Sequence, residues 1–132
     1  RARHPLIGKH CALAEVWSFG VASVNLSDAS SRKIAEVLQL AKHKEPALAV
    51  KSNNFSVLAS LVQSTDTILI STPAAVRAEL KAGLLAPLRI ADMPLIRTHF
   101  GIVTLHNRTS SPIAQKAMAC IQRVAQDLDA RQ

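Results

Sequence analysis

Short apolar runs alternate with segments of helical periodicity along most of this chain. The stretch 52–72, SNNFSVLASLVQSTDTILIST, contains one complete unit of this alternation. Four of its apolar residues recur at helical spacing: Phe55, Leu58, Ala59 and Val62. The uninterrupted apolar run at 67–71 is instead typical of a strand that is covered on both faces. Repeated units of this kind predict an α/β fold, with a mostly parallel sheet and helices on both faces.

The remaining elements are predicted from the same two periodicities and from their end signals. We expect strands or extended pieces at 17–21, 47–51, 67–71, 84–89 and 98–105. We expect one helix to begin at Ser27 or Asp28 and to end before Pro46, and the next to be capped by Asn53. A third helix is expected to start at Pro73 and to stop at Gly83, and the last to open at 111–112.

Composition bounds the possible partners. The chain of 132 residues fits one domain with a real core, and its net charge is +7. The basic residues are dispersed and aromatic residues make up 3%, so neither a basic DNA-binding arm nor a stacking surface for single strands is indicated. A positive balance favours small anions. No apolar run is long enough for a membrane span, and no signal peptide is visible, which predicts a cytoplasmic protein.

Motifs for catalysis or metal binding do not emerge from the sequence. The five histidines match no ligand spacing, and GxSxG, GxGxxG and Walker patterns are missing. The nine carboxylates are scattered, so no acid/base pair can be proposed. Cys11 and Cys120 match no metal or redox spacing and are predicted to be buried, reduced thiols. We therefore expect no enzyme activity, no catalytic or metal residues and no cofactor.

Candidate ligand-binding residues follow the predicted strands. In parallel sheets, ligands bind outside the carboxyl ends of the strands, where the N-termini of helices present free N–H groups. Three junctions are expected there, and each is rich in small, hydroxyl or amide side chains. They are Gly20, Val21, Ala22 and Ser23; Ser52, Asn53 and Asn54; and Ser71, Thr72 and Pro73. Ordinary helix capping is the alternative role of each junction.

An ordered set of segments carries a family resemblance. They are HPL at 4–6, the aromatic segment around Trp17, the stretch 52–72, LKAGLLAPL at 80–88 and FGIVTLHNRTSSPIAQKAMACIQRV at 100–124. In this order and at these spacings the chain resembles the effector-binding domain of LysR-type transcriptional regulators. Many members of that family carry a Gly pair where this chain has Ser64-Thr65-Asp66, a sequence that also favours a tight turn.

The resemblance implies a lobe of the periplasmic-binding-protein type. Residues 1–96 would form the second lobe of the effector-binding domain, and residues 97–132 would supply the returning strand and C-terminal helix of the first lobe. It places the three junctions, with the second extended to Phe55, on the rim of the cleft between the lobes, where an effector binds. The DNA-binding domain and the first part of the first lobe are expected to lie outside this chain.

The implied function is ligand sensing by a transcriptional regulator. The effector is expected to be a small organic anion, and the protein a homo-oligomer that reaches DNA only through its N-terminal domain. A periplasmic-type solute-binding domain, or a metabolic enzyme with a similar α/β lobe, is the alternative. Apolar residues of the last strand and helix would pack against the part outside this chain, which favours association with a second copy through exchanged or edge-paired strands.

Overall fold

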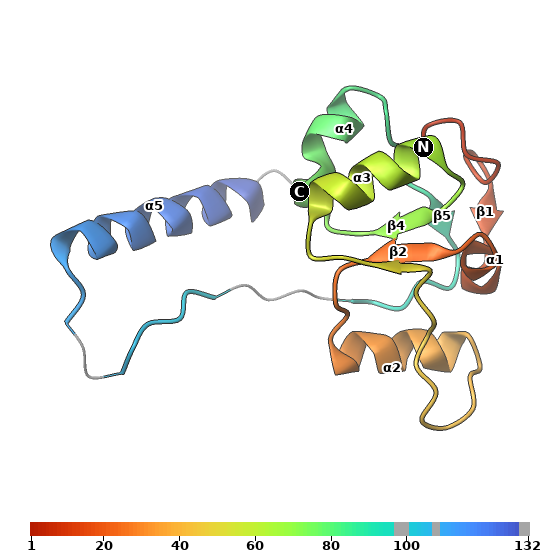
Figure 1. Ribbon diagram of the computed structural model, residues 1–132, viewed down its shortest axis with the longest axis horizontal. Coiled ribbons are helices and arrows are strands. Elements are labelled where there is room, and N and C mark those ends of the chain that lie inside the picture. The colour runs from red at the N-terminus through yellow and green to blue at the C-terminus, as the bar shows by residue number, and fades with distance from the viewer. Residues whose placement is uncertain (97–100, 107–108, 130–132) are drawn as a thin grey trace. The chain divides into compact units, whose positions relative to one another are not determined.

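The computed structural model describes residues 1–96, 101–106 and 109–129. It divides into two compact units, Arg1–Ile96 and Arg97–Gln132, which are described separately here (Figure 1). The assignment of these units to two lobes of one effector domain stays a prediction.

The first unit is built on a parallel three-stranded sheet. Its strands are β2 (Val21–Ser23), β3 (Val50–Lys51) and β4 (Ile68–Ile70), in the order β3-β2-β4. Ala22 pairs with Val50 on one side and with Leu69 on the other. A second parallel pair joins β1 (His10–Cys11) to β5 (Arg89–Ile90). The predicted α/β fold with parallel strands is therefore confirmed. β2, β3, β4 and β5 are shorter than the sequence suggested, β5 overlaps the predicted piece 84–89 only at Arg89, and β1 was not predicted.

Helices cover both faces of the three-stranded sheet. Helix α2 (Asp28–Val37) lies on one face, and α3 (Phe55–Ser64) lies on the other (Figure 1). The connection after β4 is a 3-10 helix, η1 (Pro73–Val76), which continues into α4 (Arg77–Lys81) on the same side as α3. Thus the helix that follows the middle strand, β2, covers one face of the sheet, whereas the helices that follow the two flanking strands, β3 and β4, cover the other face.

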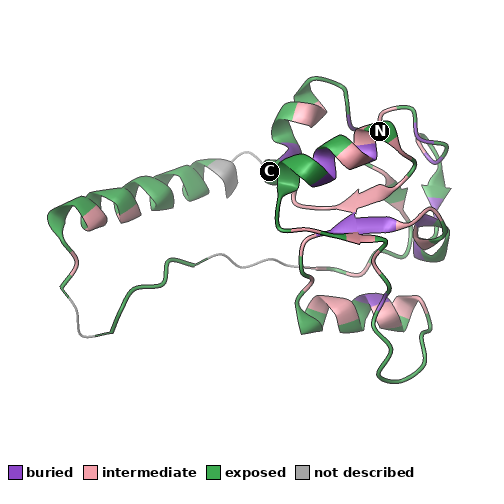
Figure 2. Cartoon of the chain, viewed as in Figure 1, coloured by how far each residue is buried: buried purple, intermediate pink, exposed green. Residues whose placement is uncertain are grey.

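Two apolar clusters hold this arrangement together, one on each face of β2 (Figure 2). Successive residues of a strand point to opposite faces. Ala22 accordingly joins the cluster below α3, whose buried members are Ala22, Leu58, Val62, Val76 and Leu85. Val21 joins the opposite cluster, whose buried members are Leu6, Cys11, Val16 and Val21. β2 is therefore the strand on which both halves of the core converge.

The predicted strand at 17–21 is wrong. Trp17 and Ser18 instead end helix α1 (Leu13–Ser18), in which Leu13 and Val16 are both completely buried at helical spacing. The indole Nε1 of Trp17 donates a hydrogen bond to the carbonyl oxygen of Ala47 at 3.0 Å. Gly20 then adopts φ +81°, a left-handed conformation suited to glycine, and the strand begins one residue later.

The second unit contains one long helix, α5 (Pro112–Asp129). It opens as predicted, because the hydroxyl of Ser111 accepts a hydrogen bond from the backbone N–H of Ala114 at 3.3 Å. Its apolar stripe is exposed in the described structure, as Ile113, Ile121 and Val124 show. Cys120 is exposed as well, which corrects the prediction of two buried thiols, whereas Cys11 is buried in the first unit.

The last predicted strand, 98–105, lies partly outside the described residues. Residues 101–105 are described, and they form no strand in the structure. All five are exposed, with Val103 at 95%.

Candidate functional site

Three connections meet at the carboxyl end of the three-stranded sheet. The chain leaves β2 toward α2, β3 toward α3 and β4 toward η1. Because all three strands are parallel, the first turns of these helices lie along one rim. α2 and α3 each have 10 residues, so their N-termini carry appreciable positive dipole ends. We call the segments 23–27, 51–55 and 70–73 the strand-end rim.

Ser23 ties the three strand ends together. It is the last residue of β2, and only 1% of it is exposed. Its hydroxyl donates a hydrogen bond to the carbonyl oxygen of Ile70, the last residue of β4, at 3.1 Å. Its own carbonyl oxygen accepts from the N–H of Ser52, just after β3, at 3.2 Å. The rim is therefore fixed by a buried polar residue at its centre.

The other residues of the first predicted junction do not lie on the rim. Gly20 precedes β2 at its amino end, and Val21 and Ala22 are completely buried inside the strand. They support the sheet, and the strand actually ends at Ser23. The loop that follows it, Val24–Ser27, replaces them on the rim, and its Asn25 is exposed. Sequence reasoning missed this loop because it ended the first strand at Val21, two residues before its actual end at Ser23.

The second junction is organised by Asn54, which corrects the expected cap at Asn53. The Asn54 side-chain oxygen accepts hydrogen bonds from the N–H groups of Ser56 at 3.0 Å and Val57 at 3.3 Å. The hydroxyl of Ser52 accepts in turn from the N–H of Asn54 at 3.1 Å. Asn53 itself is exposed. The two neighbouring asparagines thus differ: the Asn54 side chain caps the helix, whereas Asn53 does not cap it and is exposed.

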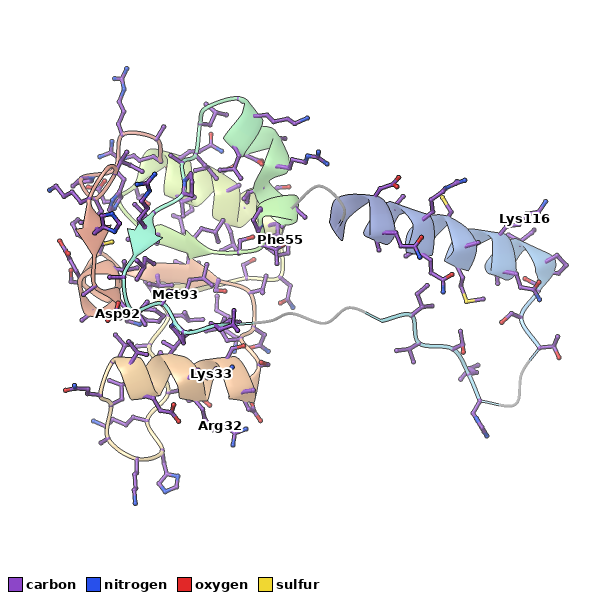
Figure 3. All side chains as sticks on the ribbon, turned by 180° about the vertical axis from the view of Figure 1, so that it is seen from behind. Arg32, Lys33, Phe55, Asp92, Met93 and Lys116 are labelled. Carbon is purple, nitrogen blue, oxygen red and sulfur yellow. The ribbon has the colours of Figure 1, made fainter. Side chains whose placement is uncertain are left out.

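Phe55 begins α3 and is 36% exposed, so its ring is partly open to solvent beside Asn54 (Figure 3). An apolar ring at the start of a helix gives the rim a surface on which the carbon skeleton of a small ligand can pack.

The third junction is half-buried at its start. Pro73 occupies the first position of η1, as predicted, and the backbone N–H of Ala75 bonds to the carbonyl oxygen of Thr72 at 3.1 Å. The side chain of Thr72 makes no capping bond, whereas the Ser71 hydroxyl donates to the Thr72 carbonyl oxygen at 3.2 Å. The Thr72 hydroxyl is therefore not committed to the helix that follows it.

Lys51 is a rim residue that the sequence-based set omitted. It is the last residue of β3, it is exposed, and its backbone is paired in register with Ser23. An ammonium group at the end of a strand, next to the Ser52-Asn53-Asn54 segment, adds a full positive charge to the rim. The signal was present in the sequence, since a lysine follows the apolar run LAV directly.

Within the described ranges, no cluster of three or more His, Cys, Asp or Glu side chains is placed to hold a metal ion. Among the same residues, no helix is both long and apolar enough to cross a membrane. The chemistry offered by the rim is thus hydrogen bonding by hydroxyl, amide and backbone N–H groups, with one nearby ammonium group.

The structure is an α/β unit with parallel strands and helices on both faces, and comparison with known proteins specifies the family, whose fold is of the periplasmic-binding-protein type. The family model described as LysR substrate binding domain matches residues 1–126. The chain therefore belongs to the LysR substrate-binding domain family, as the resemblance in the sequence implied.

A curated protein is also similar to this chain. The SDS degradation transcriptional activation protein of Pseudomonas sp. (strain ATCC 19151) is 31% identical over 120 residues, which cover 87% of this chain. The matched part is 38% of that activator, so the chain spans well under half the length of the relative. No solved structure gave a significant match to the chain.

Proposed function

We propose that this chain is the effector-sensing part of a LysR-type transcriptional regulator, and that the strand-end rim is one wall of its effector site. The observation that supports the proposal is the arrangement around Ser23, which holds the connections after three parallel strands at one edge of the sheet. A fixed polar centre of this kind pre-organises the surrounding donors, which lowers the cost of ordering them when a ligand binds. A regulator with this role would work in the cytoplasm, where its DNA is.

The proposed effector is a small organic anion. Two helix N-termini and the Lys51 ammonium group supply positive potential at the rim, and the Asn53 and Thr72 side chains supply hydrogen-bonding groups. Asp28, in the first turn of α2, is a carboxylate that opposes this potential at one edge. An anion is therefore expected nearer to Lys51 and Asn53 than to Asp28.

The proposed site is completed by a second wall. Residues 1–96 would supply the wall described above, and a facing lobe would close the cleft, in line with the 38% coverage of the similar activator. We propose that the regulator contacts DNA through another domain, and not through this chain. We also propose that copies of the chain associate, because the apolar stripe of α5 is exposed.

The test is a calorimetric titration of the chain with a panel of small carboxylic acids and their uncharged amides. Acids should bind weakly and amides should not, since one wall gives only part of the affinity. Lys51→Gln should weaken the binding of the best acid by about tenfold, because a charge-assisted contact is lost. Lys81→Gln is the matched control, since Lys81 is also exposed but lies in the last turn of α4, away from the rim.

Equal binding of acids and amides would refute the anion proposal. Equal losses in the Lys51 and Lys81 variants would mean that the attraction is only the general positive charge of the chain. Sequence-selective DNA binding by the chain alone would contradict the proposal that another domain of the regulator binds DNA.

A further inference from the structure

Residues 91–96 are the part of the first unit from which the chain continues into the second unit. They follow β5 directly and contain no helix or strand. The N–H of Ala91 donates a hydrogen bond to the carbonyl oxygen of Cys11 at 3.0 Å, so the first of these residues is still paired with β1. We call residues 91–96 the exit segment.

Asp92 fixes the start of the exit segment to α1. Its carboxylate oxygen accepts a hydrogen bond from the backbone N–H of Leu13 at 2.7 Å. That N–H belongs to the first turn of α1, and Ala12 at the N-cap position has no side chain that could accept from it. Asp92 therefore caps α1 from a distant part of the chain, and the complete burial of Leu13 keeps this attachment point in place.

Lys33 of α2 contacts the other end of the exit segment. Its ammonium group donates a hydrogen bond to the carbonyl oxygen of Leu95 at 2.9 Å. Figure 3 shows Lys33 on α2 and Asp92 at the start of the exit segment. Lys33 is exposed, and Leu95 is 69% exposed, so water competes for this bond. The exit segment thus has a firm attachment at Asp92 and a readily broken one at Leu95.

Pro94 stiffens the chain between these two attachments. A proline fixes its own φ, and it restricts the preceding residue, here Met93, to extended conformations. Few backbone torsions are therefore free to absorb a displacement between Asp92 and Leu95. It follows that the direction in which the chain leaves Leu95 depends on whether the Lys33 bond is formed.

Helix α2 connects this bond to the strand-end rim. Its N-cap, Ser27, belongs to the rim, and the Ser27 hydroxyl accepts a hydrogen bond from the N–H of Ser30 at 3.2 Å. Lys33 follows in the second turn of the same helix, next to the completely buried Ile34. Because α2 is one continuous helix of 10 residues, a displacement of its first turn also displaces Lys33.

We propose that Lys33 is a positioning residue that couples the strand-end rim to the exit segment, with Asp92 as the pivot. An effector that displaces the first turn of α2 releases the bond from Lys33 to Leu95, and the chain then leaves the first unit in another direction. The inference rests on the proposed function for the role of an effector, whereas the coupling itself requires no ligand. It assigns a part in regulation to a lysine that lies outside the rim.

The first test is whether Lys33 holds the exit segment, read by NMR relaxation of the 132-residue chain. Lys33→Met removes the donor and keeps a long side chain. The backbone order parameter of Leu95 should lie near the rigid value of about 0.85 in the unchanged chain and fall below about 0.6 in the variant. Arg32→Met is the matched control, because Arg32 is exposed and its Nε donates to the Asp28 carbonyl oxygen of its own helix at 3.3 Å. Equal losses of order in the two variants, or no loss in Lys33→Met, would overturn the inference.

The second test is a double-substitution cycle between the rim and the exit segment, with no ligand added. Ser27→Ala removes the cap of α2 and should shift the carbonyl carbon resonance of Leu95. In the Lys33→Met background the same substitution should leave that resonance unchanged. An equal shift in both backgrounds would show that Lys33 does not carry the coupling, and no shift in either would show that the coupling does not exist.

The pivot is tested in the same cycle. Asp92→Ala should abolish the shift that Ser27→Ala causes at Leu95, whereas Asp92→Asn should preserve it, since an amide oxygen still accepts from the N–H of Leu13. A shift that survives Asp92→Ala would overturn Asp92 as the pivot. These outcomes are separate from the proposed function, because failure of every acid to bind in the calorimetric titration would refute that function without changing any of them.

Discussion

Replacing Asn54 by alanine should destabilise the first unit through one identifiable loss. Asn54 is exposed, so the substitution removes little buried surface, and its main effect falls on the two hydrogen bonds to Ser56 and Val57. Those N–H groups belong to the first turn of α3, which has no intrahelical acceptors for them. Loss of an N-cap side chain costs about 1 kcal/mol of the free energy of unfolding, within a range of roughly 0.5–2 kcal/mol.

The change is large enough to measure by thermal unfolding. For a domain of the size of Arg1–Ile96, about 1 kcal/mol lowers Tm by roughly 4–8 °C. Trp17 is a suitable reporter, because it is the single tryptophan of a chain without tyrosine and its indole is bonded to Ala47 in the same unit. Unfolding followed by its fluorescence should therefore reflect the first unit and not α5.

Two further variants separate capping from other effects. Asn53→Ala should change Tm by little, because Asn53 is exposed and does not cap α3. Asn54→Asp should keep most of the stability, since a carboxylate also accepts from the first turn and favours the positive end of the helix dipole. If Asn53→Ala lowers Tm as much as Asn54→Ala, the assignment of the cap to Asn54 is incorrect.

Three other outcomes are expected. Gly20→Ala should lower the free energy of unfolding, measured by urea denaturation, by about 1–3 kcal/mol, because φ is +81° and the added Cβ would lie 3.2 Å from Cβ of Ala49. Gly83→Ala is the control: φ is +67° and nothing lies within 4 Å of the added Cβ, so its loss of stability should come from backbone strain alone. Leu58→Ala should cost about 2–5 kcal/mol, because Leu58 is completely buried, whereas Ser60→Ala on the exposed face should stay within about 0.5 kcal/mol. The chain alone should show no sequence-selective DNA binding in anisotropy titrations, and any attraction should fade steeply with added salt.

Much of the fold could be predicted because local signals and tertiary structure agree. Ser27 caps α2 through a hydrogen bond from the N–H of Ser30, and Pro73 starts η1, both at positions marked in the sequence. The apolar run at 67–71 became β4. Alternation of strands and helices was enough to predict parallel pairing, since crossover connections leave few other topologies.

The wrong predictions concern segments whose local sequence is compatible with two different structures. The segment at 17–21 is short and apolar, and such a run suits a strand or a buried helix equally well. Contacts distant in sequence decide for the helix, including the bond from Trp17 to Ala47 and the burial of Leu13. That shift moved the end of the first strand, and with it the first junction of the site. Asn53 and Asn54 are likewise equal candidates as caps, and only the register of α3 distinguishes them.

One of the two cysteines of the chain is buried and the other is exposed. Their rates of chemical modification can therefore report how often the first unit opens locally. Cys11 is 2% exposed and its thiol points to the carbonyl oxygen of Arg89 at 3.4 Å, whereas Cys120 is exposed. A thiol-specific alkylating reagent should therefore modify Cys120 at once and Cys11 only when β1 separates from β5. The delay between the first and second modification would time the opening of that strand pair under native conditions, without denaturant and without any substitution.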